Sequence, residues 1–117
     1  MRDPEERVQD ILEAIAAIER YAARDRAAFE RDELLQNWFV RHLQIIGEAA
    51  RALSESVRAL APEVPWSQII GMRNILVHGY FEVDTDIVWN AVKNDVPALK
   101  PALDRLLSRL KEPGHGS

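Results

Sequence analysis

The 117-residue sequence has no cysteine, only three histidines and no long uninterrupted apolar run. Without cysteine, disulfide scaffolds, thiolate zinc sites and thiol redox chemistry are excluded. No stretch approaches the ~18 apolar residues that a membrane span requires, and the N-terminus is acidic where a secretory signal would be basic. We therefore expect a soluble, cytoplasmic protein that has no contact with a membrane.

Glycine and proline are also scarce, with five and six residues, whereas 47% of the residues are hydrophobic and 29% are charged. This composition excludes a disordered or low-complexity chain, and the length leaves room for one core. We predict a single domain over residues 1–112 and a disordered tail over 113–117. The net charge of −4 repels nucleic acid, so RNA binding would need a concentrated local basic site.

Apolar residues recur every three or four positions and sustained alternation is missing, which predicts an all-α fold. We expect an up-and-down bundle of four to five helices with a long second core helix. Asp3 is expected to cap the first helix, whose apolar stripe runs from Val8 to Ile18 and on to Tyr21. A short helix over residues 24–31 would be anchored by Phe29.

The long helix is expected to begin after Asp32 and to continue to Leu60, before a connector between Pro62 and Pro65. A third helix would span residues 66–78. A fourth would begin after Asp84 or Thr85. We expect Pro97 and Pro101 to break or restart that helix, and Gly47 and Gly71 to mark close approaches between helices.

Unusual polar residues cluster at the end of the predicted third helix, in the run Arg73-Asn74-Ile75-Leu76-Val77-His78-Gly79-Tyr80. Helical positions five apart differ by ~140° around the axis, so Arg73 and His78 do not share one face of a regular helix. Either the helix end deviates near Gly79, or a symmetric partner presents the same segment across one cleft.

An arginine and a histidine meet the needs of metal-free RNA cleavage. Arginine supplies a permanent planar cation for phosphate, and histidine accepts or donates a proton near neutral pH. In this reaction the 2′-hydroxyl loses its proton and attacks the adjacent phosphate, and the 5′-oxygen leaves with a proton. RNA carries this nucleophile and DNA does not.

The R-x4-H-x-Y arrangement of Arg73, His78 and Tyr80, in a helical chain of this length, resembles the HepT-like toxins of the HEPN superfamily. The resemblance covers nearly the whole chain. Its supporting stretches are Ile45 to Ala50, Pro65-Trp66, Gly71 to Asn74 and His78 to Phe81.

This resemblance implies a metal-independent endoribonuclease toxin that acts as a homodimer and needs no cofactor. It implies that Arg73 binds phosphate, that His78 is the general base or acid, and that Asn74 is the polar residue of the catalytic set beside Arg73. A partner antitoxin, a minimal nucleotidyltransferase, would inactivate the toxin by transferring AMP to Tyr80. Arg41 is expected to add positive charge to the cleft.

Other interpretations remain at this stage. The main alternative is a non-catalytic HEPN module that binds nucleotides or docks the nucleotidyltransferase. A bundle that holds a metal or small ligand in its core is disfavoured, because the inner faces carry few repeated Glu or His residues. Asp84 and Asp86 could suggest a metal, but capping is preferred for Asp84. Glu48 and His42 are left outside the predicted site.

Overall fold

The computed structural model describes residues 3–71 and 84–112 and contains helices but no strand within these ranges. The predicted all-α class is confirmed. The predicted tail and the R-x4-H-x-Y segment lie outside the described residues. The helical elements are α1 (Pro4–Glu19), α2 (Arg26–Arg31), α3 (Glu33–Ala52), α4 (Glu55–Arg58), a helical stretch over 66–71, α6 (Thr85–Asn90), the π-helical η1 (Ala91–Asp95) and α7 (Val96–Lys111).

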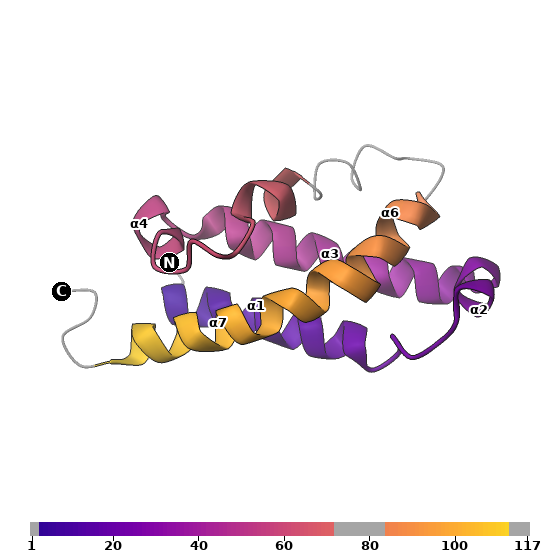
Figure 1. Ribbon diagram of the computed structural model, residues 1–117, viewed down its shortest axis with the longest axis horizontal. Coiled ribbons are helices and arrows are strands. Elements are labelled where there is room, and N and C mark those ends of the chain that lie inside the picture. Colours follow the sequence, from indigo (N-terminus) through magenta and orange to yellow (C-terminus); the bar gives the residue numbers. More distant parts are fainter. Residues whose placement is uncertain (1–2, 72–83, 113–117) are drawn as a thin grey trace.

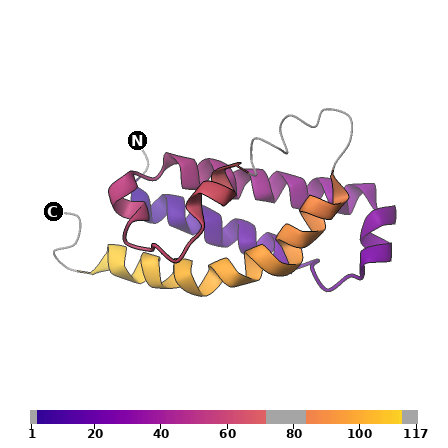
Figure 2. The same ribbon diagram turned by 45° about the horizontal axis from the view of Figure 1, so that its top comes forward.

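Three long helices lie side by side along the long axis of the molecule (Figure 1). Helix α1 packs against both α3 and α7, and these two contacts are the most extensive between helices of the bundle. Helices α6, η1 and α7 follow one another without a break and form one curved rod (Figure 2). The short helix α2 closes the end of the bundle opposite the first turn of α1 and the last turn of α7 (Figure 1).

Short polar side chains begin most of the helices, as the sequence predicts. The Oδ1 atom of Asp3 accepts a hydrogen bond from the Glu6 amide at 2.9 Å, and that of Asp32 accepts one from the Leu35 amide at 3.0 Å. Asp84 does the same for the Ile87 amide at 3.2 Å. Because the first amides of a helix have no partner inside it, each cap stabilises its helix by ~1 kcal/mol.

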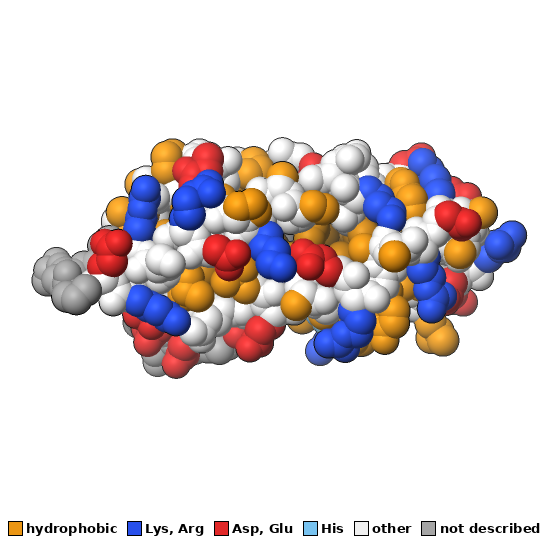
Figure 3. Space-filling model, turned by 60° about the horizontal axis from the view of Figure 1, so that its bottom comes forward, with side chains coloured by type: hydrophobic (Ala, Val, Ile, Leu, Met, Phe, Trp, Pro, Cys, Tyr) orange, Lys and Arg blue, Asp and Glu red, His pale blue; other side chains and the backbone are white. Residues whose placement is uncertain are grey.

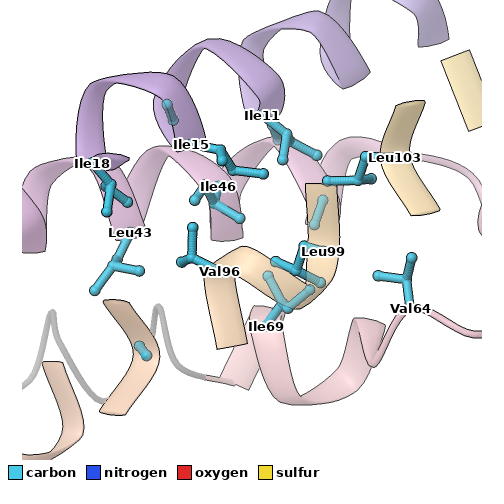
Figure 4. Packing of buried hydrophobic residues seen from close by; sticks show 14 of the residues in the cluster. Ile11, Ile15, Ile18, Leu43, Ile46, Val64, Ile69, Val96, Leu99 and Leu103 are labelled. Carbon is cyan, nitrogen blue, oxygen red and sulfur yellow. The ribbon is translucent and has the colours of Figure 1, made fainter. Parts of the chain in front are cut away.

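The core is one continuous apolar cluster, and no polar or charged side chain is buried among the described residues. Isoleucines of α1 meet Leu43 and Ile46 of α3 and Val96 and Leu99 of α7 (Figure 4). The predicted stripe of α1 is confirmed at Val8, Ile11, Ile15 and Ile18, all buried. Tyr21 is an exception, because α1 already ends at Glu19 and the Tyr21 side chain is 36% exposed.

The predicted long helix is too long by two turns. Helix α3 ends at Ala52, because Leu53 adopts extended backbone angles and Ser54 caps the separate short helix α4. Leu53 is buried, and Val57 and Leu60 still pack against the core. The apolar spacing therefore continues across a real helix boundary.

The prediction that Pro97 and Pro101 break or restart the helix holds at Pro97, where η1 gives way to α7, and is wrong at Pro101. Pro97 lies in the first turn of α7, and Pro101 lies inside that helix. A proline ring collides with the carbonyl four residues earlier in a regular helix. Here the turn before Pro97 is π-helical, and the Val96 amide donates to the Ala91 carbonyl five residues back. The wider turn gives the ring more room, and the rod continues to Lys111.

Gly47 and Gly71, both predicted to mark close approaches between helices, have different surroundings. Gly47 is buried on α3, in keeping with that prediction. At Gly71 the prediction is wrong, because no described atom lies within 4 Å of the place where a Cβ would stand. An alanine would fit at this position.

Candidate functional site

The predicted catalytic residues Arg73, Asn74 and His78 and the predicted modification site Tyr80 lie between the two described ranges. Their mutual geometry is outside the described residues, so their roles stay predictions. The described chain approaches this segment through the helical stretch over 66–71 and leaves it at Asp84, the cap of α6. The structure shows how both of these flanks are fixed to the bundle.

Trp66 fixes the flank that precedes the motif. Its indole Nε1–H group lies 3.0 Å from the carbonyl oxygens of both Arg58 and Ala61, and it donates to the two. Three residues further on, Ile69 is buried in the core. Arg109 of α7 donates to the Leu60 carbonyl and ties the same connector to the last helix. The helical stretch over 66–71, which precedes the motif in the chain, is therefore held by polar and apolar contacts together.

The flank that follows the motif is held by α2. Arg26 forms an ion pair with Asp86 of α6 and a second one with Glu30, whose Oε1 lies 2.9 Å from Arg26 Nε. Hydrogen bonds with Glu30 and Asp86 raise the pKa of the Arg26 guanidinium. The same two helices also meet through aromatic rings, since the buried Phe29 ring of α2 lies 5.3 Å from the Trp89 ring of α6. Asp86 is thus a structural partner of α2, and Asp84 is a cap, as predicted.

A pocket of about 250 Å³ separates the 63–69 segment from η1 and α7. Its polar lining includes Gln68, Asn94 and Asp95, and at its edge Glu63 and Arg105 pair at 3.6 Å. Burial raises the pKa of the Asp95 carboxyl group. Sequence reasoning missed this pocket, because its two sides lie about 30 residues apart in the chain.

A second hollow, of about 360 Å³, lies between α1 and α3 and is lined by Asp10, Glu13 and His42 among others. The Nδ1 atom of His42 lies 2.7 Å from the Trp38 carbonyl oxygen, and the imidazole ring lies 4.4 Å from the Trp38 ring. His42 is therefore half-buried and held on its own helix. Arg41 and Glu48, also on α3, are exposed.

Charges of both signs are mixed over the surface. On the face shown in Figure 3, basic and acidic side chains alternate along the length of the molecule and do not separate into fields. Within residues 3–71 and 84–112, no three histidine or acidic side chains are grouped so that they could hold a metal ion. No helix in these ranges is long and apolar enough to cross a membrane.

The comparisons with known proteins agree on one family. The family model described as "Ribonuclease HepT-like" matches residues 11–106. A protein of Thermococcus cleftensis named "Probable ribonuclease HepT" is 37% identical over 108 residues, which cover 90% of this chain and 96% of the relative. "Putative RNase MJ1380" of Methanocaldococcus jannaschii is 38% identical over 104 residues, or 88% and 95% of the two chains. No solved structure matches.

Fold and comparisons together define the class of this protein as an all-α member of a ribonuclease group. More specifically, the chain belongs to the HepT-like ribonuclease family. The resemblance inferred from the sequence is confirmed. The matched region includes all four predicted site residues, Arg73, Asn74, His78 and Tyr80.

Proposed function

We propose that this protein is a cytoplasmic, metal-independent endoribonuclease that acts as a homodimer and is the toxin of a toxin–antitoxin pair. The observation that carries the proposal is the R-x4-H motif inside the region that matches the ribonuclease family. Two of the relatives whose printed names include the word ribonuclease or RNase match this chain over 96% and 95% of their own length. RNA is therefore the substrate class that we assign.

In the proposed mechanism, His78 removes the proton of a 2′-hydroxyl, and the resulting oxygen attacks the adjacent phosphorus. Arg73 stabilises the negative charge that develops on the phosphoryl oxygens, with Asn74 beside it as a hydrogen-bonding residue. The bond to the 5′-oxygen breaks, and this oxygen leaves with a proton. The products are a 2′,3′-cyclic phosphate and a free 5′-hydroxyl.

A homodimer accounts for the spacing of the motif. Arg73 and His78 lie five residues apart, so two copies of the motif facing each other would supply both groups to one cleft. Both described flanks of the motif are attached to the bundle, the preceding one through Trp66 and the following one through the Arg26–Asp86 pair. Arg41 is exposed on α3 and is available to add positive charge.

Tyr80 is the proposed control point. A minimal nucleotidyltransferase would transfer AMP from ATP, with the Tyr80 phenol oxygen attacking the α-phosphorus and pyrophosphate leaving. The added adenosine and the phosphodiester charge two residues from His78 would exclude RNA by bulk and by charge. A Tyr80→Phe variant should cleave RNA and resist inactivation by the partner enzyme and ATP.

Cleavage of a labelled single-stranded RNA in excess chelator tests the proposed activity. The wild type should produce fragments that end in a 2′,3′-cyclic phosphate, and His78→Ala should produce none. His115→Ala is the matched control, because this histidine lies outside the motif and outside the region that matches the family. If neither wild type nor variants cleave a varied set of RNAs, the chain is a docking or nucleotide-binding module and the nuclease proposal is wrong.

A further inference from the structure

The two large apolar side chains that stand exposed in the described part of the chain lie at one pocket. Tyr21 is 36% exposed and Leu34 is 82% exposed. Both line a pocket of about 200 Å³ together with Leu35 and Trp38. Exposed apolar side chains that gather at one hollow are informative, whereas single ones are ordinary.

The aromatic wall of this pocket is fixed in advance. The Tyr21 ring stands edge-on to the Trp38 ring, with centroids 5.6 Å apart and an angle of 89° between the planes. The Trp38 indole N–H donates to the Ala17 carbonyl at 2.9 Å, and its ring packs on His42. A ligand would therefore meet ordered rings and would pay little entropy to arrange them.

The rim of the pocket offers charge of both signs. A guanidinium nitrogen of Arg24 lies 3.5 Å from Oδ2 of Asp32. Asp32 Oδ1 is already occupied by the Leu35 amide. Because guanidinium has five N–H donors, Arg24 keeps donors for a base edge or a phosphate after this ion pair. The Arg24 side chain is about half exposed, so these donors are accessible.

The pocket lies at the end of the bundle where α6 and η1, the first described helices after the motif, contact α2 and the linker between α1 and α2. Lys93 of η1 donates to the Ala22 carbonyl, and the Arg26–Asp86 pair joins α2 to α6. Ala22 and Arg26 lie on either side of Arg24 in the chain. The linker that carries Tyr21 and Arg24 is thus attached to the first helical turns that follow the predicted catalytic segment.

We infer that the Tyr21–Trp38 pocket binds one unpaired nucleobase of a single-stranded RNA, by stacking on Tyr21, with Arg24 hydrogen-bonding to that nucleotide. The inference rests on the proposed function for the identity of the substrate. A volume of about 200 Å³ is smaller than the ~300–1,000 Å³ of sites for larger ligands, which suits a single flat ring. Aromatic faces and guanidinium groups are what proteins use to hold splayed-out bases.

Binding of a fluorescent 2′-O-methyl RNA tests the pocket independently of cleavage, because this RNA has no 2′-hydroxyl to attack. Loss of one base–aromatic stack costs ~1–3 kcal/mol, so Tyr21→Ala should raise the Kd about 5- to 150-fold. Tyr21→Phe keeps the ring and should stay within about twofold of the wild type. Arg24→Ala should also weaken binding, whereas Arg7→Ala, an arginine on α1 outside the pocket, should not.

An abasic scan identifies the base itself. Removal of the base at one position of the RNA should raise the Kd of the wild type. Removal of the same base should change the Kd of Tyr21→Ala little, because that variant has already lost the stack. Unchanged affinity of Tyr21→Ala, or no binding of RNA by the wild type, overturns the inference. So does a drop in oligomeric mass of Tyr21→Ala and Leu34→Ala with normal RNA affinity, which would make the patch a contact between protein copies. A wild type that binds RNA through Tyr21 but never cuts it would instead refute the ribonuclease proposal alone.

Discussion

Removing the ring of Phe29 tests how the short helix α2 is held. Phe29 is the only buried residue of this six-residue helix and is fully inaccessible to solvent. Its ring stacks 5.8 Å from that of Phe39 and lies 5.3 Å from that of Trp89. Since an isolated helix of six residues has no stability of its own, Phe29→Ala should loosen α2 as well as destabilise the whole protein.

The size of this effect follows from the burial. Truncation of a buried phenylalanine to alanine costs ~3–5 kcal/mol, a large share of the ~5–15 kcal/mol that stabilise a typical domain. With an m-value of ~2 kcal/mol/M, a loss of ~4 kcal/mol lowers the urea midpoint by about 2 M. The control is Leu34→Ala, which removes an apolar side chain that is 82% exposed and should change stability by less than ~0.5 kcal/mol.

Urea unfolding followed by circular dichroism measures the loss of global stability, and hydrogen exchange over residues 25–33 measures the loosening of α2. Phe29→Ala should lower the midpoint and speed amide exchange most strongly in α2. Equal midpoints for Phe29→Ala and Leu34→Ala would show that the packing of Phe29 on Phe39 and Trp89 does not hold the end of the bundle.

Three further predictions concern single polar groups. Trp66→Phe deletes the indole donor shared by two carbonyls and should cost ~1–3 kcal/mol in urea unfolding; a loss below ~0.3 kcal/mol would show that the indole does not anchor the connector. Asp32→Ala removes the cap of α3 and should cost ~1 kcal/mol in thermal melts, whereas Asp32→Asn should retain most of the stability. Burial raises the pKa of Asp95, so the folded state favours its protonated form, and stability falls as pH rises from the ordinary value through the folded one. Asp95→Asn should therefore melt higher than the wild type at pH 7 and equally below pH ~3.5; equal melting temperatures at pH 7 would show that burial of the Asp95 carboxylate does not cost stability.

Local physics made much of the fold predictable. Asp3, Asp32 and Asp84 are caps because a carboxylate can reach the free amides two or three residues further on, and this depends on neighbours in sequence alone. The stripe of α1 was predictable for the same reason, since residues three and four apart share one face of a helix. Tyr21 was predicted to continue this buried stripe but is exposed, because α1 ends two residues earlier. The spacing of apolar residues does not mark that helix end.

The errors arose where several contacts decide the backbone. Leu53 is buried although it ends α3, so the apolar pattern runs through the boundary, and the pair Ser54-Glu55 was the only available signal for a new helix. The sequence predicted that Pro101 would break or restart the helix, but the rod continues because packing of α7 on the core outweighs one missing hydrogen bond.

The candidate site divides in a similar way. The family was predictable from one short run, because Arg73, His78 and Tyr80 lie within eight residues, and the comparison confirms the resemblance; the roles of these residues stay predictions. The Tyr21–Trp38 pocket was not readable, because its residues come from the end of α1, the linker and the start of α3. Such a pocket exists only once α2 has turned the chain back on itself.

The packing of the first helix against the last one also has a consequence for protein synthesis. On the ribosome, the apolar stripe of α1 can meet α3 early, but Val96, Leu99 and Leu103 of its other neighbour are translated only after all the other described helices. The nascent protein therefore exposes part of its interior until α7 has been made. A premature stop before α7 would leave an aggregation-prone fragment for chaperones and proteases to remove, so translation through α7 is a precondition for a stable molecule.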